Sequence, residues 1–297
     1  MLVLGSTRAW LAEQIRSRVV GDDPATKNAG IFDTPGPRLF APGSPIRAVH
    51  GDAALFIGGL RALLFQSLHP LAMAGVAAHS DYRADPWGRL QRTADFVAAT
   101  TFGTIDTAER AISIVRHVHE RVVGVAPDGT PYAANDPHLL HWVHLAEADS
   151  FLRAHQRYGR QRLSPIEQDR YLAESAVIAR KLGVEDPPLT VPMLRRQLAE
   201  FRPELRGTRE AREAARFLLL EPPLPLTARP AYLALAAAAV ALLPAWTRWP
   251  LRLPFLPLSE RLLVVPAGEV VTGVIRWSLS PDRPARADRS DEQTVTR

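Results

Sequence analysis

Nine histidines and no cysteines limit the side chains of this sequence that could bind a metal or act as a nucleophile. Without cysteine, disulfides, iron–sulfur clusters and thiolate chemistry are excluded. Two histidines, His117 and His119, lie in a segment over 107–123 that has the apolar periodicity of a helix. Its apolar positions are Ile112, Val115, Val118 and Val122. His119 falls within this stripe and His117 about 200° away from it. We therefore expect a solvated His117 and a buried His119, which is either hydrogen-bonded or a ligand.

A second group of chemically capable residues comprises Arg89, Arg92 and Thr93. In a helix predicted over 87–102 they share one face, because residues three and four apart are neighbours on a helix surface. The two arginines could form salt bridges or extend along the margin of an apolar face. They could also bind an anion, because the guanidinium group suits bidentate recognition of a carboxylate.

The remaining histidine candidates lie at predicted helix ends and on one long helix. His69 precedes Pro70, which favours an extended conformation at His69, and His79 lies before the break at Asp85–Pro86. These two could line a cavity between helices or serve as structural residues at helix ends. Three further candidates, His141, His144 and Glu147, follow one another at intervals of three residues. Side chains with this spacing could bind a metal. No second helix carries a matching set, and no Glu-x-x-His pair occurs, which disfavours a di-iron site.

The elements that must position these residues are predicted to be helical, and we expect an all-α fold with a single helical domain. Few segments alternate with a period of two, and no βαβ rhythm or internal repeat is visible. An Asp128–Gly129 turn flanked by short apolar pieces is the exception. We expect an N-terminal arm over 1–48 that includes a short helix over 8–20, the helical domain over 49–279, and a disordered tail over 280–297. Further helices are expected from Asn135–Asp136–Pro137 to Tyr158, from Ser164, over 190–202 and over 208–219.

Composition excludes several classes of function. The net charge is only +5, and all basic residues except Lys27 and Lys181 are arginine, which indicates a coding bias rather than a clustered nucleic-acid footprint. No GxGxxG, Walker or G-x-S-x-G motif occurs. Met1–Gly5 lacks the basic region of a signal peptide, so we expect a cytoplasmic protein. The apolar segment 231–246 is shorter than the roughly 20 residues that span a bilayer. It is either a core helix or a surface that touches a membrane or covers an apolar substrate site.

Several motifs, taken in their order and spacing, resemble the MpaB-like oxygenase family, which includes the rubber oxygenases. They are Leu68-His69-Pro70, His79-Ser80, Asp85-Pro86-Trp87-Gly88-Arg89-Leu90, Arg92-Thr93, Phe102-Gly103-Thr104, His119-Glu120-Arg121-Val122-Val123-Gly124, the run from Asp128 to Pro137, and Trp142-Val143-His144. The resemblance covers about residues 40–250. It implies a mainly helical protein with a globin-like core around a b-type haem.

The resemblance also assigns roles to residues. It implies that His119 is the proximal iron ligand, and that Arg89 and Thr93 bind the haem, holding a propionate and shaping the pocket. Rubber oxygenases have a lysine that can ligate iron at the position of Arg92, but a guanidinium is a very poor ligand. They have a glutamate base at the position of Met73, so either His69 or His79 takes the distal polar role, or the chemistry differs. His69, His79 and Arg92 are therefore the candidate catalytic residues.

These residues lead to one main functional hypothesis and two alternatives. The main hypothesis is a haem-b oxygenase that uses O₂ to oxidise a hydrophobic alkene, isoprenoid or lipid. The haem, and not the side chains, would activate the O₂. The first alternative is a non-catalytic haem- or lipid-binding helical protein of the same fold. The second is a helical scaffold without a cofactor. No nucleic acid is expected as a partner. Peripheral membrane contact through 231–246 is an alternative that the sequence does not decide.

Overall fold

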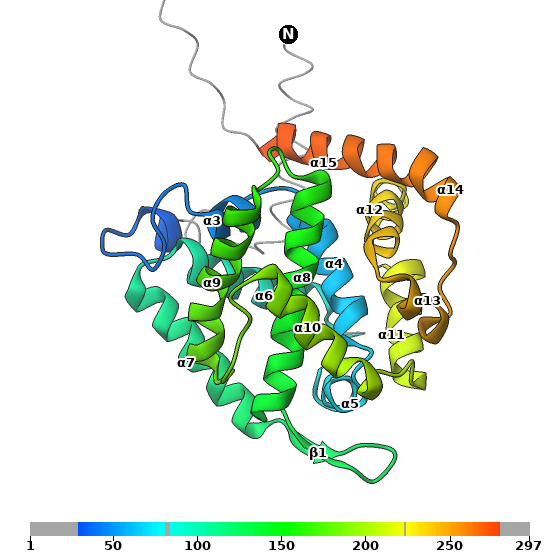
Figure 1. Ribbon diagram of the computed structural model, residues 1–297, viewed down its shortest axis with the longest axis horizontal. Helices are drawn as coiled ribbons and strands as arrows, with labels where there is room; N and C mark the ends of the chain where they lie inside the picture. Colours follow the sequence, from blue (N-terminus) through cyan, green and yellow to red (C-terminus); the bar gives the residue numbers. More distant parts are fainter. Residues whose placement is uncertain (1–28, 81–83, 223, 280–297) are drawn as a thin grey trace, which may run out of the picture.

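Residues 29–80, 84–222 and 224–279 are described in this computed structural model, and their regular structure is almost entirely helical (Figure 1). A hairpin of two three-residue strands is the only sheet in these ranges. The expected all-α fold is therefore confirmed. The helix expected over 8–20 and the tail expected over 280–297 lie outside the described residues. The expected boundaries at 48 and 279 stay predictions, and the first α-helix described already begins at Pro45.

The elements follow one another along the chain with short connections. They are η1 (Ala29–Asp33), α3 (Pro45–His50), α4 (Leu55–Gln66), α5 (Pro70–His79), α6 (Pro86–Phe102), α7 (Ile105–Arg121), β1 (Val123–Val125), β2 (Pro131–Ala133), α8 (Pro137–Tyr158), α9 (Pro165–Leu182), α10 (Val191–Phe201), η2 (Arg202–Glu204), α11 (Arg209–Leu220), α12 (Arg229–Leu242), α13 (Ala245–Leu251), α14 (Pro257–Ser259), η3 (Glu260–Val264) and α15 (Val265–Leu279).

Proline and capping side chains decide where many of these helices begin. A proline occupies the first helical position of α3, α5, α6, α8 and α9, where its missing N–H would have no partner in any case. The expected caps are present: Asp136 accepts a hydrogen bond from the backbone N–H of His138, and Ser164 and Glu167 form a reciprocal capping box. The expected turn at Gly129 has φ of 87°, a conformation that glycine adopts without strain.

Helix α4 lies at the centre of the bundle, packed between α8 and α12. Its Arg61 is completely buried and donates to Asp149 Oδ2 at 2.7 Å, to Ser150 Oγ at 2.6 Å and to the Leu242 carbonyl at 3.0 Å. A buried charge needs such partners, because an unpaired one would be expensive to desolvate. This one side chain therefore joins α4 to both of its neighbouring helices.

The other elements surround this centre and leave a space beside it. Helices α6 and α7 are consecutive in the chain and pack against each other, and the β1–β2 hairpin extends from the end of α7 (Figure 1). Helix α15 crosses one end of the bundle, in contact with α12 and α8 (Figure 1). These outer elements form the walls of the cavity described below.

The apolar segment expected over 231–246 forms α12 and the start of α13, with a bend of 117° between the two helices at Leu243–Pro244. Most of the second half of α12 is buried: Ala236, Ala238, Ala239 and Val240. The stretch Pro257–Leu279 is a different case, because it is the one described helix that is long and apolar enough to cross a membrane by itself, and only 22% of it is buried. The bent pairs α4–α5 and α12–α13 would each pass the same test only if taken together as broken spans.

Candidate active site

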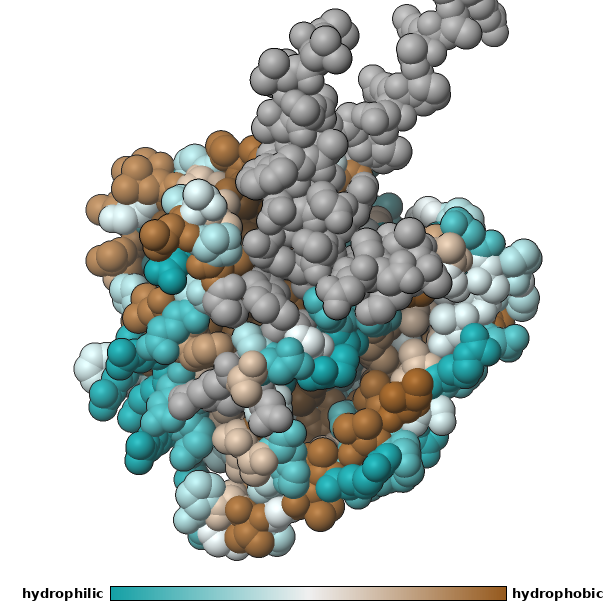
Figure 2. Space-filling model, turned by 180° about the vertical axis from the view of Figure 1, so that it is seen from behind, coloured by the Kyte–Doolittle hydropathy of each residue, from teal (hydrophilic) through white to brown (hydrophobic). Residues whose placement is uncertain are grey.

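A cavity of about 1780 Å³ lies between α4, α6, α7 and α8, and it reaches α11, α12 and α15. It is larger than the roughly 300–1,000 Å³ of most small-molecule sites, so it can hold a large cofactor together with a substrate. Apolar side chains form most of its walls, among them Met73, Phe96, Phe151, Phe217 and Leu235. The surface is hollowed on the face shown in Figure 2, where apolar residues border the hollow.

His119 lies on the cavity wall, in the last turn of α7. Its imidazole is partly buried and has no hydrogen-bond partner among the residues that the structure describes. Burial lowers the pKa of His119 below its usual value, so the ring is neutral at physiological pH. A neutral imidazole has a free ring nitrogen, which is the state that binds a metal.

Its neighbour His117 has the opposite environment, as the helical periodicity predicts. The His117 side chain is 66% exposed and lies 3.4 Å from Glu120. The stripe around His119 is less enclosed than expected, because Val118 is 49% exposed although it lines the cavity together with Val115 and Val122. The stripe therefore faces an open cavity and not a closed core.

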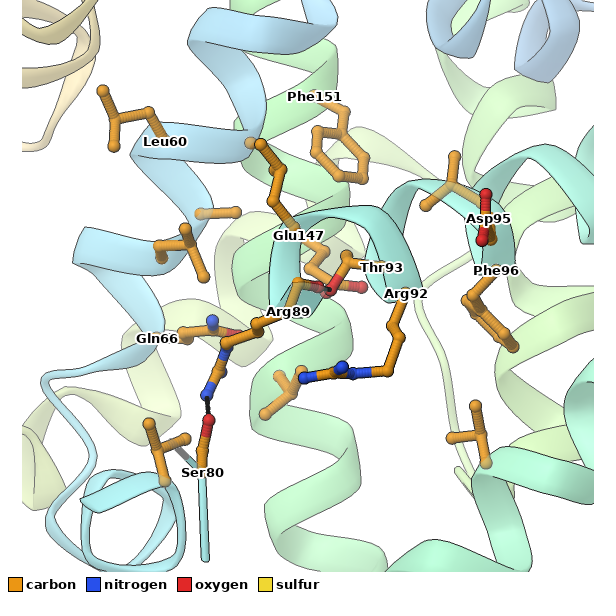
Figure 3. A pocket seen from close by; sticks show the side chains of 18 of the residues that line it. Leu60, Gln66, Ser80, Arg89, Arg92, Thr93, Asp95, Phe96, Glu147 and Phe151 are labelled. Carbon is orange, nitrogen blue, oxygen red and sulfur yellow. Dashed lines mark hydrogen bonds between the residues drawn. The ribbon is translucent and has the colours of Figure 1, made fainter. Parts of the chain in front are cut away.

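Helix α6 brings Arg89, Arg92 and Thr93 to the same cavity (Figure 3). Asp85 caps this helix by accepting from the Gly88 N–H at 2.8 Å. Arg89 donates to the Ser80 hydroxyl at the end of α5, and Thr93 donates to the Arg89 carbonyl at 3.0 Å. The Arg92 side chain is 69% exposed and lies 3.3 Å from Asp85. Arg92 is therefore paired with Asp85, and both arginines line the cavity.

The two histidines proposed for a distal polar role are in different places. His79, the last residue of α5, lines the cavity, with Nε2 3.1 Å from the Val123 carbonyl oxygen. His69 is buried and is not among the cavity residues; its ring lies beside Trp142, His138 and Glu204. The cavity thus brings together His79, Arg89, Arg92, Thr93 and His119, but not His69.

A polar wall on the cavity was missed as such by the sequence analysis. It consists of His144 and Glu147 on α8, Tyr171 on α9 and His50 on α3. Burial raises the pKa of Glu147 to about 7 and lowers the pKa of His50 and of His144 to about 3. Nε2 of His50 and of His144 has no hydrogen-bond partner among the described residues. At neutral pH this wall consists of uncharged imidazoles beside a carboxyl group that is close to half ionised.

The spacing of His141, His144 and Glu147 suggested a metal site, and the structure separates these residues. His144 and Glu147 face the cavity, whereas the His141 ring lies against Phe201 at 5.6 Å. The signal that could have identified part of the polar wall is the spacing of His144 and Glu147, three residues apart on one face of α8. Its position beside a cavity depends on tertiary structure that the sequence does not display.

Comparison with known proteins identifies a family. The family model described as ER-bound oxygenase mpaB/B'/Rubber oxygenase, catalytic domain, matches residues 47–277, which is most of the chain. No curated protein and no solved structure matches significantly. The globin-like arrangement implied by the resemblance therefore stays a prediction.

Proposed function

The chain belongs to the ER-bound oxygenase mpaB/B'/Rubber oxygenase catalytic-domain family and is therefore an oxygenase; from this premise we propose that it uses haem b to oxygenate or cleave a hydrophobic substrate. The observation that carries this proposal is the unpartnered, neutral His119 imidazole on the wall of a large apolar cavity. Both features would suit a haem, because its macrocycle is apolar and a neutral imidazole such as that of His119 would ligate its iron.

The residues around the cavity fit the other parts of a haem. Arg89 supplies a guanidinium that suits a propionate carboxylate, and Thr93 lies one turn further along α6. When bound, the haem would supply the activation of O₂. The protein would supply the histidine that ligates the iron, the anion-binding side chain and a mainly apolar cavity.

The substrate in this proposal is a hydrophobic alkene, isoprenoid or lipid, because the cavity is large and its lining is mainly apolar. Met73 takes the place of the family's glutamate base, is 3% exposed and cannot accept a proton. Glu147, on the opposite helix α8, lines the same cavity and is the acidic side chain there whose pKa burial raises. We assign to Glu147 the role of holding or accepting a proton near the substrate, with His79 as the polar group at the other side.

Haem binding is tested by titrating the purified chain with hemin and recording the absorption spectrum before and after dithionite. A Soret band that saturates at one equivalent and shifts on reduction is expected. His119→Ala should lose this band. His117→Ala is the matched control, because it removes a histidine from the same helix, and it should bind hemin normally. Full hemin binding by His119→Ala would contradict the ligand assignment, and a chain that takes up no hemin would contradict the proposal as a whole.

Turnover is tested separately, with the haem-loaded chain, O₂ and a panel of alkenes and isoprenoids. Products that carry oxygen from ¹⁸O₂ would support the oxygenase chemistry on this substrate class. Haem binding without any oxygen-dependent product would favour the alternative of a non-catalytic haem- or lipid-binding protein.

We also propose that the chain lies on a membrane through an apolar surface formed by α13–α15. This surface consists of Trp249, Phe255, Leu256, Leu258, Leu262, Leu263, Val270, Val274 and Trp277, all of them exposed. Another side of α15 is tied to the protein by Arg276–Asp52 at 2.7 Å and Glu269–Arg157 at 3.0 Å. These ion pairs favour a helix that lies in the membrane interface over one that crosses the bilayer.

The cavity strengthens this proposal, because Val271, Val274 and Ile275 of α15 also line it. A hydrophobic substrate could then pass from the lipid to the cavity without crossing water. The family description includes ER-bound members, which supports membrane association here. Co-sedimentation with phosphatidylcholine vesicles should be strong for the native chain and weak for the double variant Leu262→Asp, Leu263→Asp. Ile166→Asp is the control, because Ile166 is 81% exposed on α9, outside this surface. Equal binding of all three would contradict the assignment.

A further inference from the structure

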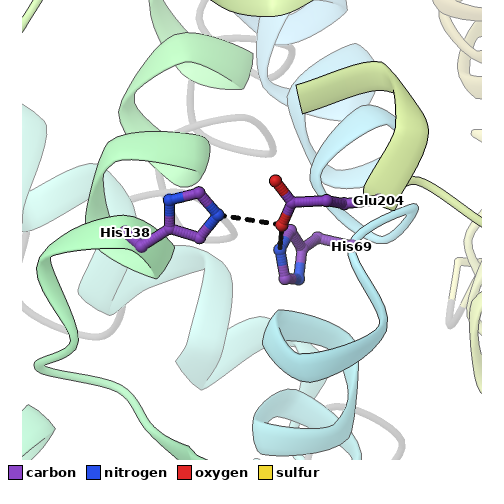
Figure 4. Close-up of side chains that lie close together, drawn as sticks. All are labelled: His69, His138 and Glu204. Atoms are coloured by element: carbon purple, nitrogen blue, oxygen red, sulfur yellow. Dashed lines mark hydrogen bonds and ion pairs between the residues drawn. The ribbon is translucent and has the colours of Figure 1, made fainter. Parts of the chain in front are cut away.

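His69, His138 and Glu204 converge at a place outside the cavity (Figure 4). Glu204 Oε2 lies 2.8 Å from His138 Nε2 and 3.4 Å from His69 Nε2. One ligand atom from each residue lies within 4.8 Å of the other two. Among the described residues this is the one group of three or more histidine, cysteine or acidic side chains with that geometry.

Local structure holds each of the three residues in place. His69 is the extended residue before Pro70 at the start of α5, and Pro70 restricts its backbone. His138 lies in the first turn of α8, directly after its Asp136 cap. Glu204 ends η2, the short helix that follows α10. Three elements that are distant in sequence thus present their side chains to one point.

The aromatic surroundings restrict the rings further. His138 stacks on Phe201 with ring centroids 4.5 Å apart, and the His69 ring lies 6.3 Å from both Trp142 and Phe201. The His69 side chain is only 3% exposed, whereas His138 and Glu204 are 53% and 42% exposed. The group therefore has a buried side that fixes a ligand and an open side that admits an ion and water.

We propose that His69, His138 and Glu204 bind a divalent transition-metal ion such as Zn²⁺, with a water molecule completing the coordination. Zinc binds histidine nitrogen and carboxylate oxygen at about 2.0–2.2 Å in tetrahedral sites, which places ligand atoms roughly 3.3 Å apart by that geometry. The separations of 2.8 and 3.4 Å are close to this value, so an ion can enter with small side-chain movements. Two imidazoles and one carboxylate form a donor set that suits zinc and related ions, and leave a position for water.

This site is distinct from the proposed oxygenase centre, because none of its three residues lines the cavity. It joins η2 to the starts of α5 and α8, and α5 and α8 contribute cavity residues such as Met73 and Glu147. A bound ion would therefore fix the α10–α11 connection to two helices of the cavity wall.

The test is isothermal titration of the full chain with ZnCl₂ after treatment with EDTA and buffer exchange. We expect saturation at one equivalent with a Kd of about 10 µM or tighter, a value that isolated surface histidines do not reach. His138→Ala and Glu204→Ala should each weaken binding at least about tenfold, since the loss of an outer-shell partner alone costs about 10- to 100-fold. Both side chains are partly exposed, so both variants should fold, and unchanged melting temperatures without zinc would verify this.

A matched control is available in the exposed His117–Glu120 pair, whose His Nδ1–carboxylate distance is also 3.4 Å. His117→Ala should bind zinc as the native chain does. The proposal is overturned by the absence of saturable binding up to about 1 mM zinc, the weak end of the affinity scale, or by zinc binding that His138→Ala and Glu204→Ala leave unchanged. His138→Ala and Glu204→Ala should bind hemin normally. Measuring their hemin binding therefore distinguishes a failure of the zinc site from a failure of the proposed function.

Discussion

Glu147 should make the stability of this protein fall as the pH rises, and replacing it by glutamine should remove that dependence. Burial on the cavity wall raises the pKa of Glu147 from 4.5 to about 7. Between these two values the folded chain keeps a proton that the unfolded chain has lost. Stability therefore decreases with pH over this window, and the whole cost is present above pH 7.

The size of the effect follows from the same shift. Each pKa unit corresponds to about 1.4 kcal/mol, so the change from 4.5 to about 7 amounts to about 3 kcal/mol at pH 8 and less than about 1 kcal/mol at pH 5. Glutamine has the shape of the protonated carboxyl group and does not ionise. Glu147→Gln should thus raise the free energy of unfolding by about 3 kcal/mol at pH 8 and change it little at pH 5.

The assay is urea denaturation followed by circular dichroism at pH 5, 6, 7 and 8, for the native chain and Glu147→Gln. Glu185→Gln is the control, because Glu185 is exposed to solvent in the loop that follows α9, and this variant should unfold like the native chain at each of these pH values. If the native chain and Glu147→Gln lose stability in parallel between pH 5 and pH 8, the carboxyl group does not lie in the environment described here, and the reasoning fails.

Two further substitutions test the packing of α4. Arg61→Met should destabilise the fold by about 3 kcal/mol, because it leaves Asp149 buried without its main partner, and urea midpoints will measure this. Arg209→Ala, the control, breaks an exposed pair and should leave the urea midpoint nearly unchanged. Gly58→Ala should cost about 1–3 kcal/mol, because its new methyl group would lie only 3.0–3.2 Å from side-chain and backbone atoms of α8. Gly59 is the next residue, and a methyl group there would have no atom within 4 Å. Gly59→Ala should therefore stabilise the helix by up to about 1 kcal/mol. Equal thermal midpoints for the two glycine variants would contradict this close contact between α4 and α8.

Helix ends were the most predictable features of the fold, because they depend on residues close in sequence. The capping box of Ser164 and Glu167, the Asp136 cap and the turn at Gly129 all involve interactions within a few residues. The different exposures of His117 and His119 also follow from helical periodicity alone. Each of these predictions needed only the local chain and no knowledge of its neighbours in space.

The surroundings of individual side chains were much less predictable. His69 meets Glu204, 135 residues away in the sequence, and this contact removes it from the cavity that His79 lines. Glu147 was noticed only as part of a metal-like spacing, because its burial results from α6, α8 and α9 together. No local pattern encodes which helices enclose a cavity.

The position of the exposed apolar surface was also not predictable from the local sequence. The apolar stretch 231–246 stands out in the sequence, but much of α12 is covered by α4 and α15. The stretch over 257–279 contains Glu260, Arg261, Glu269 and Arg276, which lower its mean hydropathy. Glu260, Glu269 and Arg276 pair with other parts of the protein, and the apolar side of the helix is left outside.

The central position of α4 has a consequence for synthesis on the ribosome. Arg61 emerges early, but its partners Asp149 and the Leu242 carbonyl follow 88 and 181 residues later. Ribosomes add about 5–20 residues per second, so Leu242 is synthesised roughly ten seconds or more after Arg61. Until α12 has been made, α4 exposes an apolar face and an incompletely paired charge. The nascent chain should therefore depend on holding chaperones, and native structure should form only after nearly the whole chain has been translated.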